Sequence, residues 1–141
     1  MNKYECLKLK NQLCFPLYSA SNKIIRSYKP LLKELNLTYT QYLVMMALWE
    51  KEPVIVKSLG ECLFLGTGTL SPVIQRLEAK GYIERASIEE DERIVAILLT
   101  DAGKKLKEKA VSIPTKLGKE FKLESEEVEQ LYKILYKILD E

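Results

Sequence analysis

The sequence predicts a mainly α-helical fold with a small β wing, and three observations support this prediction. Apolar residues recur at the 3.6-residue period of helices along most of the 141-residue chain. Only one pair of neighbouring stretches, residues 82–87 and 93–99, resembles a strand hairpin. Hydrophobic residues make up 47% of the chain and charged residues 30%, which excludes disordered and collagen-like classes. We therefore expect a single soluble domain that spans residues 1–141.

The first 50 residues predict two helices. The first covers about residues 13–35, where Pro16 fits only near the helix start and Pro30 predicts a kink or break near Lys29. Thr38 and Gln41 have the spacing of a capping box, in which each residue caps the backbone of the other. A second, largely buried helix should therefore start after Thr38 and end near residue 50.

Residues 52–81 predict a short strand followed by two short helices. Residues 52–56 are rich in β-branched side chains and too few for a helix. A helix over 57–64 should bury Cys62, and residues 66–68 should form the turn after it. Thr69 is the expected cap of the next helix, which places Pro72 in the first turn and ends at Gly81. The apolar stripe of this helix is Leu70, Val73, Ile74 and Leu77.

The rest of the chain predicts a hairpin and further helices. An acidic tip at residues 89–92 separates the two strands. Thr100 and Asp101 cap a helix that should end or bend near Ile113, because Pro114 disfavours a helical residue before it. The last helix opens at Ser125 and has a near-heptad apolar spacing.

Several chemistries are excluded by composition. The chain has no histidine, which removes Ser-His and Cys-His catalytic pairs and His-based metal sites. Its three cysteines, Cys6, Cys14 and Cys62, form no CxxC pair, so we expect no metal, no cofactor and no enzyme. The longest apolar run, residues 42–49, is far below the ~20 residues of a membrane span, and no signal peptide precedes it. We expect a cytoplasmic protein with no membrane partner.

The order short helix, turn, second helix and hairpin is that of a winged helix-turn-helix. The second helix leaves a small polar face outward, which fits a DNA major groove about 12 Å wide. That order also occurs in domains that bind no DNA, so both interpretations stay open on element order alone. The outward residues are Thr69, Ser71, Pro72, Gln75, Arg76 and Ala79.

Four segments in order, residues 65–72, 76–81, 91–93 and 99–103, closely resemble the MarR family of winged-helix transcription regulators. Residues 11–18 and 37–43 resemble its organic-hydroperoxide-sensing branch. The resemblance implies a repressor that binds a pseudo-palindromic double-stranded DNA operator as a homodimer. Residues 37–100 would form the winged helix-turn-helix, and residues 1–36 and 101–141 the dimerisation helices. Apolar terminal helices that one monomer would leave poorly covered agree with a dimer.

The resemblance also assigns roles at the wing. Asp91 and Arg93 match an Asp-x-Arg pattern whose arginine reaches into the minor groove and is held by the aspartate. A narrow groove concentrates negative potential, which makes an inserted guanidinium physically sensible. The neighbouring residues Glu89, Glu90 and Glu92 should point away from DNA or reduce the protein's non-specific affinity for DNA.

Cys14 is the expected redox sensor. A thiol near a helix start lies among unpaired N–H groups that stabilise the thiolate, the form that peroxides oxidise. The resemblance implies that Tyr28 and Tyr39 of the partner subunit hydrogen-bond this thiol. No cysteine follows Cys62, so the oxidised thiol should be capped by a small cellular thiol or oxidised further, although Cys6 could act as a resolving thiol.

Two other functions remain open at this point. One is a MarR-type regulator that binds a phenolic or drug-like ligand in the dimer cleft while Cys14 stays inert. The other is a thiol peroxidase that uses Cys14 directly. The complete DNA-reading module and the lack of a clear resolving cysteine argue against the peroxidase.

Overall fold

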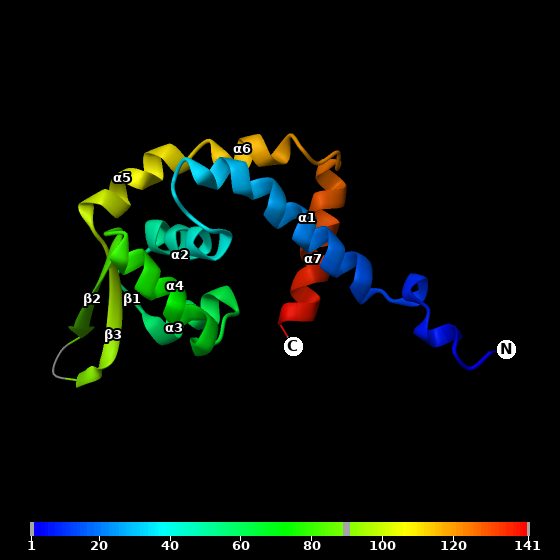
Figure 1. The fold of residues 1–141 in the computed structure, drawn as a ribbon, viewed down its shortest axis with the longest axis horizontal. Coiled ribbons are helices and arrows are strands. Elements are labelled where there is room, and N and C mark those ends of the chain that lie inside the picture. Colours follow the sequence, from blue (N-terminus) through cyan, green and yellow to red (C-terminus); the bar gives the residue numbers. More distant parts are fainter. Residues whose placement is uncertain (1, 89–90, 141) are drawn as a thin grey trace.

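The computed structural model describes residues 2–88 and 91–140, with the backbone alone at 91 and 92. A row of helices forms one side of the molecule, and the helix-turn-helix and a small sheet lie below this row in Figure 1. The elements are η1 (Glu5–Leu7), η2 (Leu9–Asn11), α1 (Cys14–Lys33), α2 (Tyr39–Glu50), β1 (Val54–Ile55), α3 (Val56–Leu63), α4 (Thr67–Ala79), β2 (Ile83–Ile88), β3 (Asp91–Leu99), α5 (Asp101–Ala110), α6 (Ile113–Gly118) and α7 (Ser125–Leu139). This is the mainly helical winged helix-turn-helix that the sequence predicts.

α1 continues through Pro30 to Lys33, so the break expected near Lys29 does not occur. Pro30 removes one backbone N–H, whose acceptor four residues earlier would be the carbonyl of Arg26. Both residues are exposed, and water can satisfy that carbonyl. The proline is therefore tolerated on the outer face of a continuous helix.

α2 starts with the capping box that the sequence predicts. The backbone N–H of Gln41 donates to Oγ1 of Thr38 at 3.3 Å, and the N–H of Thr38 donates to Oε1 of Gln41 at 3.1 Å. The helix is central to the core, where Val44, Met45 and Leu48 are at most 1% exposed. α2 therefore packs against α1 on one side and against α3 and α4 on the other.

α4 begins three residues earlier than expected. The carbonyl of Gly66 accepts from the N–H groups of Thr69 and Leu70 at 3.1 and 2.9 Å, so Gly66 is the N-cap and the prediction of Thr69 was wrong. Residues 67 and 68 are helical, and the turn lies at residues 64–66. Pro72 consequently falls beyond the first turn, where it is exposed and removes one helical hydrogen bond.

The wing is a three-stranded antiparallel sheet with the order β1-β3-β2. Ile83 pairs with Leu99 and Ala86 with Ala96, and an irregularity follows Ser87. β1 has only two residues of the five expected in strand conformation, and it pairs with Ile97 and Ala96. Gly81 ends the turn after α4 with a φ of 80°, a conformation that favours glycine. The predicted tip residues Glu89 and Glu90 lie outside the described residues.

The helices after the wing follow the sequence prediction. Oγ1 of Thr100 accepts from the N–H of Gly103 at 3.1 Å and so caps α5, and the chain bends between α5 and α6 just before Pro114. α7 buries none of its residues in the monomer, and α1 buries only Leu32. Across the described residues, the structure contains no helix with the length and apolar character of a membrane span.

Candidate DNA-reading and redox site

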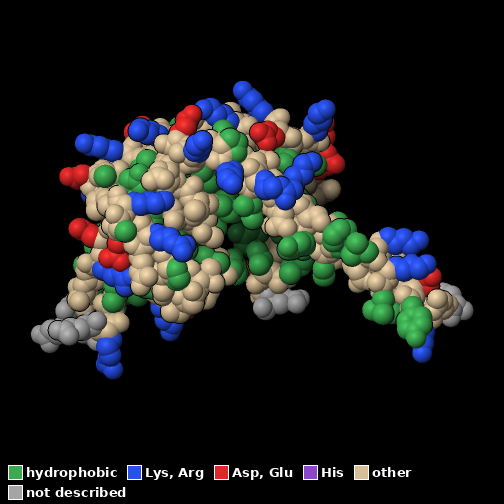
Figure 2. All heavy atoms as spheres, in the orientation of Figure 1, with side chains coloured by type: hydrophobic (Ala, Val, Ile, Leu, Met, Phe, Trp, Pro, Cys, Tyr) green, Lys and Arg blue, Asp and Glu red, His purple; other side chains and the backbone are tan. Residues whose placement is uncertain are grey.

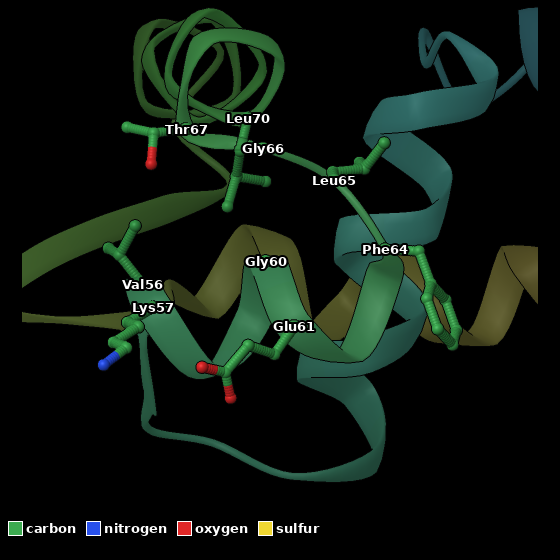
Figure 3. Close-up of a pocket in the computed structure, with 9 residues that line it drawn as sticks. All are labelled: Val56, Lys57, Gly60, Glu61, Phe64, Leu65, Gly66, Thr67 and Leu70. Atoms are coloured by element: carbon green, nitrogen blue, oxygen red, sulfur yellow. The ribbon is translucent and has the colours of Figure 1, made fainter. Parts of the chain in front are cut away.

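The turn between α3 and α4 is set by two residues that the sequence analysis did not single out. Phe64 has a left-handed φ of 56° and ends α3. A Cβ on Gly60 would lie 2.9 Å from the carbonyl oxygen of Leu65, so only glycine lets the turn fold back this tightly. Figure 3 shows α3 lying under the start of α4 with Gly60 facing this turn. The left-handed conformation of Phe64 could not be predicted from its residue type, because this conformation is common only for Gly, Asn and Asp.

α4 presents the face that the sequence predicts for DNA. Leu70, Val73, Ile74 and Leu77 are at most 5% exposed and fix the rotation of the helix against the core. Of the six predicted recognition residues, Ser71 is half-buried and the other five are exposed: Thr69, Pro72, Gln75, Arg76 and Ala79. The structure therefore brings these six side chains together on one accessible helix face.

The wing carries two arginines, of which Arg85 contacts this helix. Arg93 is exposed on β3, while the side chain of Asp91 lies outside the described residues. Arg85 on β2 donates through Nε to Oε1 of Glu78 on α4 at 2.6 Å, which ties the wing to the recognition helix. The sequence analysis did not identify this pair, because residues from a helix and a strand meet there only in the folded chain.

Cys14 is the first residue of α1, and its thiol is exposed. The first N–H groups of a helix have no partner within it, and no side chain caps this end. Apolar residues close to Cys14 in the sequence are also exposed: Leu13 is 81% exposed and Tyr18 is 67% exposed. The thiol thus lies at an accessible, amide-rich position on an uncovered apolar surface.

Tyr28 and Tyr39 are in contact. Their ring centroids are 4.8 Å apart, and Tyr42 lies 5.7 Å from Tyr28. Burial raises the pKa of Tyr28 to about 12, with smaller contributions from the neighbouring Tyr39 and Tyr42. Burial raises the pKa of Tyr39 as well. Both hydroxyls therefore stay protonated at neutral pH and can donate hydrogen bonds.

Within one chain, the structure does not bring Cys14 to the two tyrosines. Fourteen residues of continuous helix separate Cys14 from Tyr28, which corresponds to about 21 Å at 1.5 Å per residue. The thiol lies at one end of α1, and the tyrosine pair lies near the other end. Any contact between them must therefore join two copies of the chain.

The other two cysteines are also exposed. The prediction that Cys62 is buried was wrong: it is exposed and is one of the residues that line a hollow of about 390 Å³ between α2, β1 and α3. Leu59 takes the core-facing position on α3 with 0% exposure, and Cys62, three residues later, is rotated away from it. Cys6 lies in η1, where its thiol donates to the carbonyl of Lys3.

Comparison with known proteins agrees with this geometry. Residues 26–110 match the family model "Transcriptional regulator SarA/Rot". The chain is 49% identical over 139 residues to the organic hydroperoxide resistance transcriptional regulator of Bacillus subtilis, covering 99% of this chain and 95% of that one. The chain belongs to the MarR/SarA family of transcription regulators.

Within the MarR/SarA family, the chain belongs to the organic-hydroperoxide-sensing branch, as its motifs indicated. It is 42% identical to the regulator SarZ of Staphylococcus aureus over 87% of this chain and 83% of that one. Among solved structures it resembles reduced AbfR bound to DNA, with a TM-score of 0.81 and 34% identity over 96% of both chains. The fold and the family that the sequence predicted are therefore confirmed.

Proposed function

We propose that this MarR/SarA-family regulator is a homodimeric repressor that leaves its DNA operator when an organic hydroperoxide oxidises Cys14. The observation that carries the proposal is the exposed Cys14 thiol at the start of α1, in a chain that also has a recognition helix and a wing. The similarity to a Bacillus subtilis regulator of organic hydroperoxide resistance supports the choice of oxidant.

The uncovered apolar surfaces of α1 and α7 support the dimer. Four apolar side chains of α7 are at least half exposed: Val128 at 50%, Tyr132 at 62%, Ile134 at 56% and Ile138 at 56%. Surfaces of this kind are typical of subunit interfaces, because exposed apolar area in a monomer costs free energy that association recovers. A twofold dimer presents two recognition helices to DNA, and such helices enter successive major grooves about 34 Å apart.

Figure 2 shows where apolar side chains near the free ends of α1 and α7 are uncovered. Hydrophobic side chains line the side on which the ends of α1 and α7 stand clear of the helix-turn-helix, and Lys and Arg side chains gather elsewhere on this face. A second copy would cover this apolar side. The recognition helix and the wing would remain free for DNA.

The dimer also explains the separation between the thiol and the tyrosines. In our proposal, Tyr28 and Tyr39 of one subunit donate hydrogen bonds to the Cys14 thiolate of the other. Their raised pKa values keep the hydroxyls as donors at neutral pH. The unpaired N–H groups at the start of α1 add to the stabilisation of the thiolate.

Oxidation would break this arrangement. The thiolate attacks the outer oxygen of the hydroperoxide, which yields a cysteine sulfenic acid and releases the corresponding alcohol. A small cellular thiol then attacks the sulfenic sulfur, releases water and leaves a bulky mixed disulfide at the interface. A packed interface cannot absorb this group without movement, so the two recognition helices lose their spacing. AbfR has been solved in an overoxidised form bound to DNA and in a disulfide-formed state, which supports redox chemistry within this family.

The test measures release from DNA. An operator is first selected from a random duplex library with the reduced wild-type protein. Binding is then measured with cumene hydroperoxide, a small thiol, both or neither. We expect the wild type to release DNA when hydroperoxide and thiol are both present. Cys14→Ser should bind DNA and should not be released by these reagents. Cys62→Ser is the matched control and should behave as the wild type. Release of Cys14→Ser at the wild-type dose would contradict the proposal and favour a ligand in the dimer cleft.

The role of the two tyrosines is tested separately from that of the thiol. Tyr28→Phe and Tyr39→Phe keep the aromatic ring and remove only the donor. Reduced variants should bind the operator as wild type does, but hydroperoxide should release them more slowly. Unchanged release rates in both variants would exclude the two hydroxyls from the site.

A further inference from the structure

A hollow between the end of α1 and the end of α4 carries three lysines that the function described so far does not use. Its volume is about 360 Å³, and the connection from α1 to α2 forms part of its wall. The hollow shares no residue with the thiol and tyrosine arrangement or with the α4 face assigned to DNA. The residues that line it are Lys29, Lys33, Asn36, Leu37, Thr38 and Lys80.

The charge of these lysines is not neutralised within the described part of the chain. No Asp or Glu lines the hollow, and no described carboxylate forms an ion pair with its lysines. Nζ of Lys80 donates to the carbonyl of Asn36 and, at 2.7 Å, to Oε1 of Gln41, which are both neutral acceptors. An ammonium group has three donors, so one donor of Lys80 stays available. Burial and the neighbouring Arg76 lower the pKa of Lys80, as expected for a cation without a counter-ion.

The two lysines of α1 are not needed to cap their own helix. The carbonyl of Leu32 accepts from the N–H groups of Leu35 and Leu37 at 3.0 and 3.2 Å, and that of Lys33 accepts from Asn36 at 3.1 Å. Lys29 and Lys33 are four positions apart, so their exposed side chains lie on one face of α1. Their ammonium groups are therefore available to a ligand.

The start of α2 adds positive potential at the same place. Thr38 lines the hollow and is also the N-cap of α2. The capping box occupies the N–H of Gln41, whereas the N–H groups of Tyr39 and Thr40 donate to no other described residue. Unpaired N–H groups at a helix start favour anions, and phosphate groups are often bound there. Three side chains and one helix end therefore contribute to a single anion-binding surface.

We propose that this hollow binds the phosphate group of a small phosphate monoester. Such a group carries a charge of about −1.5 to −2 at pH 7, which suits several ammonium groups together. Lysine binds phosphate as a point charge, whereas the planar fork of arginine matches a carboxylate better. The absence of arginine from the lining residues therefore favours phosphate over carboxylate.

The size and the walls of the hollow leave room for the organic part of the ligand. Small-molecule sites have volumes of about 300–1,000 Å³, and this hollow lies within that range. Leu37, which is 7% exposed, and the methylene stems of the lysines provide apolar contacts. A bound monoester would join the end of α1 to the end of α4.

The position of the hollow separates it from the DNA-reading surface. Lys80 follows Thr69 by eleven residues along α4, which corresponds to about 16 Å at 1.5 Å per residue. Figure 1 shows the connection from α1 to α2 beside the row of helices, whereas the wing strands run away from that row. The inference depends on these positions and contacts and not on the release of DNA by hydroperoxide.

Thermal unfolding without DNA tests the proposal. The reduced protein is unfolded in phenyl phosphate, inorganic phosphate or sodium chloride at equal ionic strength. A ligand at ten times its Kd lowers the unfolding equilibrium constant about elevenfold per site. We expect phenyl phosphate to raise the unfolding midpoint above that in chloride, and to do so at lower concentration than inorganic phosphate. No rise would overturn the inference, and equal effects of the two phosphates would indicate an adventitious ion only and would overturn the assignment to a monoester.

A variant with both Lys29→Gln and Lys33→Gln tests the location of the site. Both side chains are exposed, so the variant should unfold in chloride close to wild type, but phenyl phosphate should no longer stabilise it. Lys80 is left unchanged because it holds Asn36 and Gln41. Lys23→Gln is the matched control, since Lys23 is exposed on the same helix outside the hollow. Phosphate also stabilises proteins by exclusion from their surface, and an unchanged effect in the double variant would show that cause alone and contradict the site.

DNA binding by the same double variant distinguishes the source of the phosphate. Its affinity for an arbitrary duplex, and the salt dependence of that affinity, should equal those of wild type, because the proposed ligand is a small molecule. A lost contact with the DNA backbone would instead lower the slope of log K against log salt by about 0.9 for each lysine involved. A slope reduced in this way would assign the hollow to DNA and overturn the inference.

Discussion

Gly103→Ala should both destabilise the protein and weaken DNA binding. Gly103 lies in the first turn of α5, against the base of the wing. A Cβ at this position would lie 2.1 Å from the carbonyl oxygen of Tyr82 and 3.2 Å from Cδ2 of Leu99. The carbonyl cannot easily move, because it accepts from the N–H of Thr100 at 3.0 Å. The backbone of Gly103 is also held, since its own carbonyl accepts from Nε1 of Trp49 at 2.9 Å.

The size of the effect follows from this geometry. Ordinary van der Waals contact for a Cβ begins near 3.4 Å, so α5 and the wing base must separate by more than 1 Å. Overpacking of this kind costs about 1–3 kcal/mol, and a smaller gain of about 0.4–1 kcal/mol from the stiffer unfolded chain offsets part of it. We expect the free energy of unfolding to fall by about 1–2 kcal/mol, a substantial part of the 5–15 kcal/mol typical of domains.

The functional effect follows from the place of α5 in the chain. α5 connects the wing to α6 and α7, and we propose that α7 contributes to the dimer interface. A shift at Gly103 changes the angle between the wing and the interface, and therefore the spacing of the two recognition helices. Operator affinity should fall even under conditions where the variant remains fully folded.

Urea unfolding followed by circular dichroism measures the stability effect. Gly118→Ala is the matched control, because a Cβ on Gly118 meets nothing within 4 Å. That substitution should raise the free energy of unfolding by about 0.4–1 kcal/mol. Equal stabilities for Gly103→Ala and wild type would refute the reasoning, since the contact with Tyr82 leaves no room for an unstrained Cβ.

Three other changes have defined outcomes. Arg93→Ala should weaken operator binding by about 1–3 kcal/mol without altering unfolding, which anisotropy and urea titrations check; unchanged binding would remove Arg93 from the interface. Gln75→Ala should change the bases preferred in a selection from random duplexes, and an unaltered preference would exclude contact with a base edge. Tyr28, whose pKa of about 12 exceeds the ordinary 10, contributes stability that is complete below pH 10 and is lost as the pH rises through 12. Tyr28→Phe should therefore lose less stability than wild type over that pH interval in urea titrations, and equal losses would contradict this assignment.

Much of the fold followed from local signals in the sequence. The capping box of Thr38 and Gln41, the cap at Thr100 and the left-handed Gly81 act within a few residues, so the sequence alone locates them. The apolar stripe from Leu70 to Leu77 fixes the orientation of α4 and therefore the face that carries Gln75 and Arg76. The motifs of the chain indicated the family, which the comparisons confirm.

Other features depended on contacts between distant segments, and the tertiary structure alone decided them. The N-cap of α4 is Gly66 because Gly60 allows a tight turn before it, and neither the capping preference of Thr69 nor the position of Pro72 indicated this start. Cys62 is exposed because Leu59 fills the core-facing position on α3, although helical periodicity permits either orientation. The ion pair between Arg85 of β2 and Glu78 of α4 likewise joins a strand and a helix that meet only in the folded chain. Periodicity and capping act over a few residues, whereas these features depend on which surfaces meet when the chain packs.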